Sequence, residues 1–155
     1  MKSVFSYTIL ASFVILFSLV ACSSTGAAPT LNPTEGAQTL AGGYTTTITE
    51  ADFSKIQSYD PDLPSNQGDW LISLTNDGQF NAEKDGQFIA SGLFTASGNK
   101  LDVYVKSVCE NCGCQDGIGR YVWALKGDQL TIAKTAGMCD GMDLVLTAHP
   151  LTRQP

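Results

Sequence analysis

The sequence predicts an all-β fold, an eight-stranded antiparallel up-and-down barrel with a short N-terminal helix. Three observations lead to this fold class. Apolar and polar residues alternate with period two, turn dipeptides separate the alternating stretches, and no window of about a dozen residues keeps a 3.6-residue period. A unit of glycine, any residue and an aromatic also recurs at intervals of about one hairpin, at Gly42, Gly68, Gly92 and Gly119. Eight antiparallel strands in sequence order can close into a barrel with no exposed edge.

The clearest hairpin covers residues 119–133, with Gly127-Asp128 as a two-residue turn. This turn pairs apolar residues across the two arms: Leu125 with Leu130, and Trp123 with Ile132. Because a shift of one residue would turn every apolar side chain to the opposite face, the pattern predicts one register.

The first strand is expected at residues 43–49, which are rich in β-branched residues, with Tyr44, Thr46 and Ile48 on one face. Thr49 and Asp52 have the spacing of a capping box, so we expect a short helix to follow this strand as far as Ile56.

Two further turns, Asn76-Asp77-Gly78 and Gly98-Asn99, set the register of the central strands. They predict four pairs: Leu74 with Phe80, Ile72 with Ala82, Phe94 with Val103, and Ala96 with Leu101. Gly92 predicts a kink within the strand at 87–95. The last strand is expected at residues 144–147.

The interior of this barrel is predicted to contain five large side chains, which are the candidate ligand-binding residues: Trp70, Phe80, Phe94, Trp123 and Ile132. Short side chains at Thr46, Ala82 and Ala96 leave room among them, so we expect a small cavity. An eight-stranded barrel is wide enough to be filled by side chains or to hold one small ligand, and both possibilities stay open.

Residues 1–21 have the pattern of an export signal, with Lys2 followed by an apolar run. The last three of these residues and Cys22 form the tetrapeptide Leu19-Val20-Ala21-Cys22, which resembles the lipobox of bacterial lipoproteins. In that family the cysteine is acylated and becomes the first residue of the mature protein. The resemblance implies that Cys22 anchors the protein in membrane lipid, in the bacterial envelope outside the cytoplasm. An ordinary cleaved signal is the alternative.

Residues 22–39 are small, polar and proline-containing, and we expect a flexible tether that leads to a barrel domain at 40–155. Lys2 is the only charged residue within 1–21, so cleavage takes the formal net charge from −6 to −7. An acidic surface without a basic stripe argues against nucleic acid as a partner, and against electrostatic docking on anionic lipid.

Residues 119–153 are similar to the C-terminal half of small bacterial lipocalin-like, calycin-type lipoproteins. In those proteins a Gly-Thr-Tyr-x-Trp-x-Leu hairpin precedes a cysteine loop and a closing Ala-His-Pro-Trp-Thr-Arg. The matching residues are Gly119, Tyr121, Trp123, Leu125, Cys139 and the segment 148–153, in which Leu151 stands in place of the tryptophan. The resemblance implies a barrel closed by Arg153 over an aromatic of an early strand, Tyr44 or Trp70. By analogy of fold, it also implies binding of a small, partly apolar molecule.

Four cysteines follow Cys22, namely Cys109, Cys112, Cys114 and Cys139, and an even number in an exported protein predicts two disulfides. Extending the register of the 119–133 hairpin brings Cys114 nearest to Cys139 and leaves Cys109 with Cys112. A zinc or copper(I) site that adds Cys139 or His149 to the three close thiols is the alternative, and a redox role is another.

The chain shows no Gly-x-Ser-x-Gly, phosphate-binding or dinucleotide motif, and His149 is its only histidine. We therefore expect no enzyme, no catalytic residues, no resident metal and no cofactor. The leading hypothesis is non-enzymatic binding of a small, partly apolar molecule. Two alternatives remain, an envelope module with a solid barrel that binds another protein, and a metal or redox role at the cysteine loop.

Overall fold

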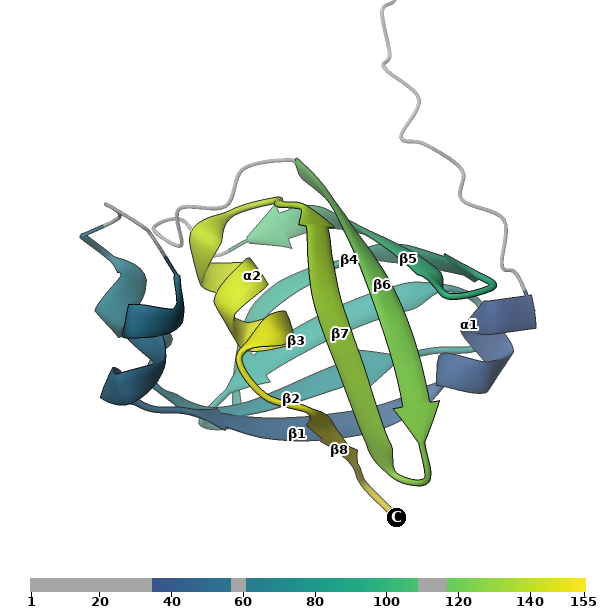
Figure 1. Ribbon diagram of the computed structural model, residues 1–155, viewed down its shortest axis with the longest axis horizontal. Helices are drawn as coiled ribbons and strands as arrows, with labels where there is room; N and C mark the ends of the chain where they lie inside the picture. The colour runs from purple at the N-terminus through teal and green to yellow at the C-terminus, as the bar shows by residue number, and fades with distance from the viewer. Residues whose placement is uncertain (1–34, 57–60, 109–116) are drawn as a thin grey trace, which may run out of the picture.

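The eight strands form one closed antiparallel barrel, which confirms the predicted fold class. The computed structural model describes residues 35–56, 61–108 and 117–155. Each strand pairs with the next, and the last strand closes the barrel by pairing with both the first and the seventh (Figure 1). The strands are β1 Gly42–Ile48, β2 Gly68–Leu74, β3 Gln79–Lys84, β4 Gln87–Ser97, β5 Lys100–Val108, β6 Gly117–Lys126, β7 Gln129–Ala136 and β8 Leu151–Arg153.

All three predicted hairpin registers are present. In the β6–β7 hairpin Leu125 faces Leu130 and Trp123 faces Ile132. The β2–β3 and β4–β5 hairpins contain the four central pairs that the turns predicted. Gly78 has a φ of 83°, the left-handed conformation that a three-residue turn requires of it.

The predicted kink at Gly92 is also present. The β4–β5 register shifts between Ser91 and Gly92. A Cβ on Gly92 would collide with the backbone of Tyr104 on the neighbouring strand, so only glycine allows the strands to approach this closely.

The strand expected at residues 144–147 is wrong, because these residues belong to the helix α2 Asp140–Thr147. The closing strand lies later, at β8. A short apolar run such as Leu144–Val145–Leu146 fits a buried strand or a buried helix equally well. Tertiary packing favours the helix here, because in this conformation all three side chains are buried in the core.

The extrapolated register that favoured a Cys114–Cys139 disulfide does not hold either. The β6–β7 register shifts between Arg120 and Tyr121, and β7 ends at Ala136. Cys139 is the N-cap residue of α2 and packs against the core. Cys109, Cys112 and Cys114 lie outside the described residues, so both cysteine pairings stay predictions.

Helical segments lie at both ends of the barrel (Figure 1). The helix α1 Glu35–Leu40 lies at one end, and residues 35–39 of the predicted tether belong to it. Its Ala37 and Leu40 are fully buried.

The capping-box prediction is confirmed, because the Asp52 carboxylate accepts hydrogen bonds from the Thr49 backbone and side chain, but the helix that it starts is 3₁₀. This helix, η1 Glu50–Lys55, lies at the other end with α2 and a second 3₁₀ helix, η2 Leu63–Asn66.

No helix among the described residues is both long and apolar enough to cross a membrane.

Candidate binding site

The barrel interior is a packed hydrophobic core. Of the five candidate interior residues, Trp70, Phe80, Phe94 and Ile132 are buried, and Trp123 is partly buried against them. The small residues expected to leave space, Thr46, Ala82 and Ala96, are buried among them too. Four of the five predicted interior side chains are thus buried and Trp123 is partly buried, and their role in ligand binding stays a prediction.

Arg153 closes the barrel over Tyr44. Its guanidinium carbon lies 5.3 Å from the centroid of the Tyr44 ring, and the two residues are cross-strand partners between β8 and β1. Of the two aromatics that the resemblance allowed, Tyr44 is therefore the partner and Trp70 is not. The same guanidinium donates to the backbone oxygens of Thr39 and Ala41, at 2.9 and 2.7 Å. Arg153 thus ties the last strand to the first strand and to the end of α1.

A cleft of about 880 Å³ lies on the outer face of β1, β2 and β3, beside the segment that joins α2 to β8. Because the side chains of Thr46 and Trp70 are buried, their strand neighbours Thr45, Thr47, Asp69 and Leu71 face outward along it. Its lining also includes the β3–β4 turn and the segment before β8, and consists of Thr45, Thr46, Thr47, Thr49, Asp69, Trp70, Leu71, Glu83, Asp85, Gly86, His149, Pro150 and Thr152.

The threonines and acidic residues of this cleft are partly ordered by one another. Thr47 Oγ1 donates to Asp69 Oδ1 at 2.7 Å, and the Asp69 backbone N–H donates to Asp85 Oδ1 at 3.0 Å. Lys84 Nζ lies 4.0 Å from Asp85 Oδ2, and the Asp85 side chain is more than half exposed, so this ion pair contributes little stability. The cleft lining contains three carboxylates and no lysine or arginine.

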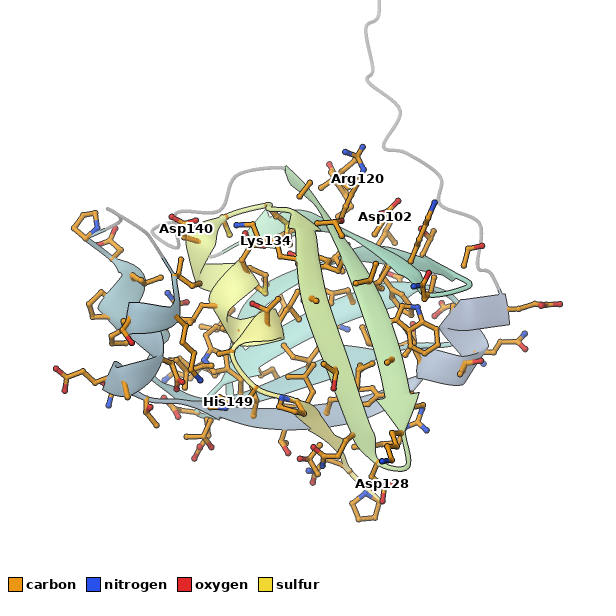
Figure 2. All side chains as sticks on the ribbon, viewed as in Figure 1. Asp102, Arg120, Asp128, Lys134, Asp140 and His149 are labelled. Carbon is orange, nitrogen blue, oxygen red and sulfur yellow. The ribbon has the colours of Figure 1, made fainter. Side chains whose placement is uncertain are left out.

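His149 lies in the segment between α2 and β8 (Figure 2). It borders the cleft and is held by Asp52. His149 Nε2 donates to Asp52 Oδ1 at 2.8 Å, and Lys55 Nζ lies 2.6 Å from the same oxygen. Lys55 also donates to the Ala148 carbonyl at 3.2 Å, so η1 is fastened twice to the segment before β8.

Asp52 is ionised despite being buried. Burial alone would raise the pKa of its carboxyl group. Hydrogen bonds from Lys55, from the Thr49 backbone and side chain, and from His149 outweigh burial and hold the pKa below its usual range. The carboxylate is therefore a fixed negative charge beneath the imidazole.

A second buried carboxylate, Asp143, anchors α2 to the barrel. The Tyr121 hydroxyl donates to Asp143 Oδ1 at 2.6 Å, and Lys134 Nζ lies 2.7 Å from Asp143 Oδ2. Burial raises the pKa of Tyr121 far above its usual range, and the neighbouring Asp143 raises it further, so the phenol stays protonated and donates. Asp143 and Asp140 border a smaller cleft of about 360 Å³ with Lys55 and Lys134.

These two carboxylate networks and the cleft were not predicted as sites. Asp52 had a sequence signal, the capping box, and His149 was noticeable as the single histidine. Asp143 had none, because it directly precedes the segment 144–147 expected to be a strand. Within the described residues no group of three or more histidine, cysteine, aspartate or glutamate side chains could hold a metal ion.

No family model, curated protein or solved structure matches this chain. The closed eight-stranded antiparallel barrel is compatible with a lipocalin-like fold.

Proposed function

We propose that this protein is a lipid-anchored, extracytoplasmic, lipocalin-like protein that binds a small, partly apolar molecule without transforming it. The observation that carries the proposal is the cleft of about 880 Å³ beside β1. A pocket that holds a drug-sized ligand usually has at least about 300 Å³, with apolar walls and a few polar groups that fix orientation. Leu71 and Pro150 supply apolar surface, while threonines, carboxylates and His149 supply the polar groups.

The cleft is a better candidate than the barrel interior because the interior side chains already pack against one another. Phe80 and Phe94 are fully buried in the same cluster as Tyr44, and a ligand among them would have to displace packed side chains. The cleft needs no such rearrangement. Trp70 is the one candidate ligand-binding residue that also lines the cleft, so it would contribute both to the core and to the cleft wall.

The proposed location and partners rest on the sequence. The lipobox-like end of residues 1–21 supports acylation of Cys22, with membrane lipid as the partner of the anchor. Intact-mass analysis of protein from the membrane fraction should then show an acylated chain that begins at Cys22. A soluble mature form without lipid, unchanged by Cys22→Ser, would rule the anchor out.

Native mass spectrometry of the protein purified from its own envelope tests the binding function. The mass should include a retained small molecule. Thr47→Trp, which fills the cleft from an exposed position, should abolish retention, whereas Thr131→Trp, a matched exposed position on β7, should not. A molecule that survives Thr47→Trp but is lost in Trp123→Ala would place the binding site in the interior instead.

A second candidate function, an envelope module that binds another protein, is favoured by two exposed apolar side chains. Phe88 on β4 is 55% exposed and Ile118 on β6 is 45% exposed. Single exposed apolar residues are common on protein surfaces, so this observation is weaker than the cleft. If no small molecule is retained, pull-down with Phe88→Ser as the control variant becomes the test. The metal or redox alternative falls on cysteines outside the described residues and stays a prediction.

A further inference from the structure

The imidazole of His149 is held by the protein on one nitrogen only. Nε2 donates to Asp52 Oδ1 at 2.8 Å, and within the described part of the chain no hydrogen bond to Nδ1 is found. The side chain is 41% exposed and lines the cleft. A group in the cleft can therefore reach the imidazole.

Asp52 determines which tautomer of His149 is present. Its carboxylate is 97% shielded from solvent, and the hydrogen bonds from Lys55 and Thr49 keep it ionised. An ionised carboxylate accepts hydrogen bonds and cannot donate one. In the neutral imidazole the proton therefore lies on Nε2, and Nδ1 carries the lone pair of an acceptor.

The charged groups that line the cleft are also acceptors. Asp69, Glu83 and Asp85 contribute carboxylates, whereas the lining includes no lysine or arginine. Lys84, which lies outside the lining, is 4.0 Å from Asp85 and offsets only that one charge. The Thr49 hydroxyl is already used as a donor to Asp52, at 2.8 Å. An anionic ligand would meet repulsion here, whereas a ligand rich in N–H or O–H donors would satisfy these acceptors.

We propose that the ligand of this cleft donates a hydrogen bond to Nδ1 of His149, with Asp52 as the positioning residue that sets the tautomer. The ligand is an amphipathic molecule that carries ammonium or hydroxyl donors and no negative charge, with its apolar part against Leu71 and Pro150. This inference rests on the proposed function, because it names the ligand class of the same cleft.

The single histidine makes a direct test possible. Long-range proton–nitrogen NMR spectra of the ¹⁵N-labelled full chain at pH 8, above the ordinary histidine pKa of about 6.5, report the tautomer and each imidazole nitrogen separately. Three probes with the same six-carbon body are then added in turn, namely hexylammonium, 1,6-hexanediol and hexanoate.

The free protein should show the Nε2–H tautomer. Hexylammonium or hexanediol should shift the Nδ1 resonance to saturation, and hexanoate should not. The two donor probes distinguish a cationic from a neutral ligand. A free protein with the proton on Nδ1, no saturable shift with either donor probe, or a saturable shift with hexanoate would overturn the proposal.

Two variants separate the roles of the two residues. His149→Leu should weaken binding of the responding probe about tenfold, which is the loss expected of one hydrogen bond. Thr131→Leu, on β7 and outside the cleft lining, should leave the affinity unchanged. Asp52→Asn should replace the single tautomer by a mixture, a readout that a purely structural role would not move. Unchanged affinity in His149→Leu, or an unchanged tautomer in Asp52→Asn, would contradict the assigned role.

This test can fail independently of the proposed function. If the protein from its own envelope retains a molecule in the cleft that does not shift the Nδ1 resonance, the cleft is a binding site. In that case His149 does not accept a hydrogen bond from the ligand. If no molecule is retained and no probe binds, both proposals fail.

Discussion

The guanidinium carbon of Arg153 lies 5.3 Å from the centroid of the Tyr44 ring, which is fully buried. This contact joins the last strand to the first, and it is reinforced by hydrogen bonds from Arg153 to two backbone oxygens around the end of α1. The Arg153 side chain thereby connects β8, β1 and the end of α1.

Replacement of Arg153 should therefore destabilise the whole barrel. Arg153→Met should lower the free energy of unfolding by about 2 kcal/mol, since it removes a cation–π contact and two charge-assisted hydrogen bonds at a partly exposed site. Urea unfolding measures the loss. Arg120→Met, at an exposed position on β6, is the control and should change stability by less than about 0.5 kcal/mol. Equal effects of the two variants would show that Arg153 does not close the barrel.

Tyr121→Phe should weaken the attachment of α2 to the barrel. The change leaves the buried Asp143 without the hydroxyl donor that lies 2.6 Å away, at an expected cost of about 1–3 kcal/mol in the free energy of unfolding.

The raised pKa of Tyr121 also makes the stability of the protein depend on pH. Its contribution is fully present below the ordinary tyrosine pKa of 10.0 and is lost as the pH rises above it, because the unfolded phenol ionises first. Urea unfolding at pH 8 and pH 11 should show this loss in the original protein and less of it in Tyr121→Phe. Tyr104→Phe on β5 is the control, and an equal cost there would contradict the account.

Asp52 should make the protein sensitive to acid. Its pKa is lowered in the folded state from an ordinary value of 3.8, so the unfolded state takes up a proton first as the pH falls. The stabilisation is complete above about pH 5 and is lost progressively as the pH falls through 3.8 towards the lowered pKa of the folded state. Thermal unfolding between pH 2 and pH 6 should therefore show a smaller acid loss in Asp52→Asn than in the original protein. Asp128→Asn, at an exposed turn, should retain the full acid loss.

The predicted Cys114–Cys139 disulfide would close a loop of about 25 residues and contribute about 3 kcal/mol in the chain-entropy model. Cys139 lies where β7 leads into α2, so the bond would also fix the start of that helix. Cys139→Ser should lower the melting temperature more than Cys109→Ser does, and peptide mapping without reductant identifies the pairs. Four free thiols with about one metal ion per chain would favour the zinc or copper alternative.

The hairpins could be predicted because their information is local. A turn such as Gly127-Asp128 sets which residues face each other, and alternation decides which face is buried. The helix α2 could not be predicted in this way. Its apolar run is too short to show a period. The helix depends on tertiary packing, namely its buried apolar side chains and the contact between Asp143 and Tyr121.

The cleft escaped prediction for a related reason. Outward-facing threonines such as Thr45 and Thr47 have the same pattern on a solvated strand as on the floor of a cleft. What creates the cleft is the return of the segment around His149 beside the first strand, which depends on where β8 pairs. The Asp52–His149 pair joins η1 to that segment, and neither residue's local sequence points to the other.

The most direct test of the account is to map where the retained molecule binds. Backbone amide NMR spectra of the ¹⁵N-labelled protein, with and without the molecule recovered from its own envelope, locate the contact surface. We expect the largest shifts along the cleft, at residues 45–49, 69–71, 83–86 and 149–152. Shifts concentrated instead at Phe80, Phe94 and Ile132 would show that the ligand enters the barrel interior and would contradict the assignment of the cleft.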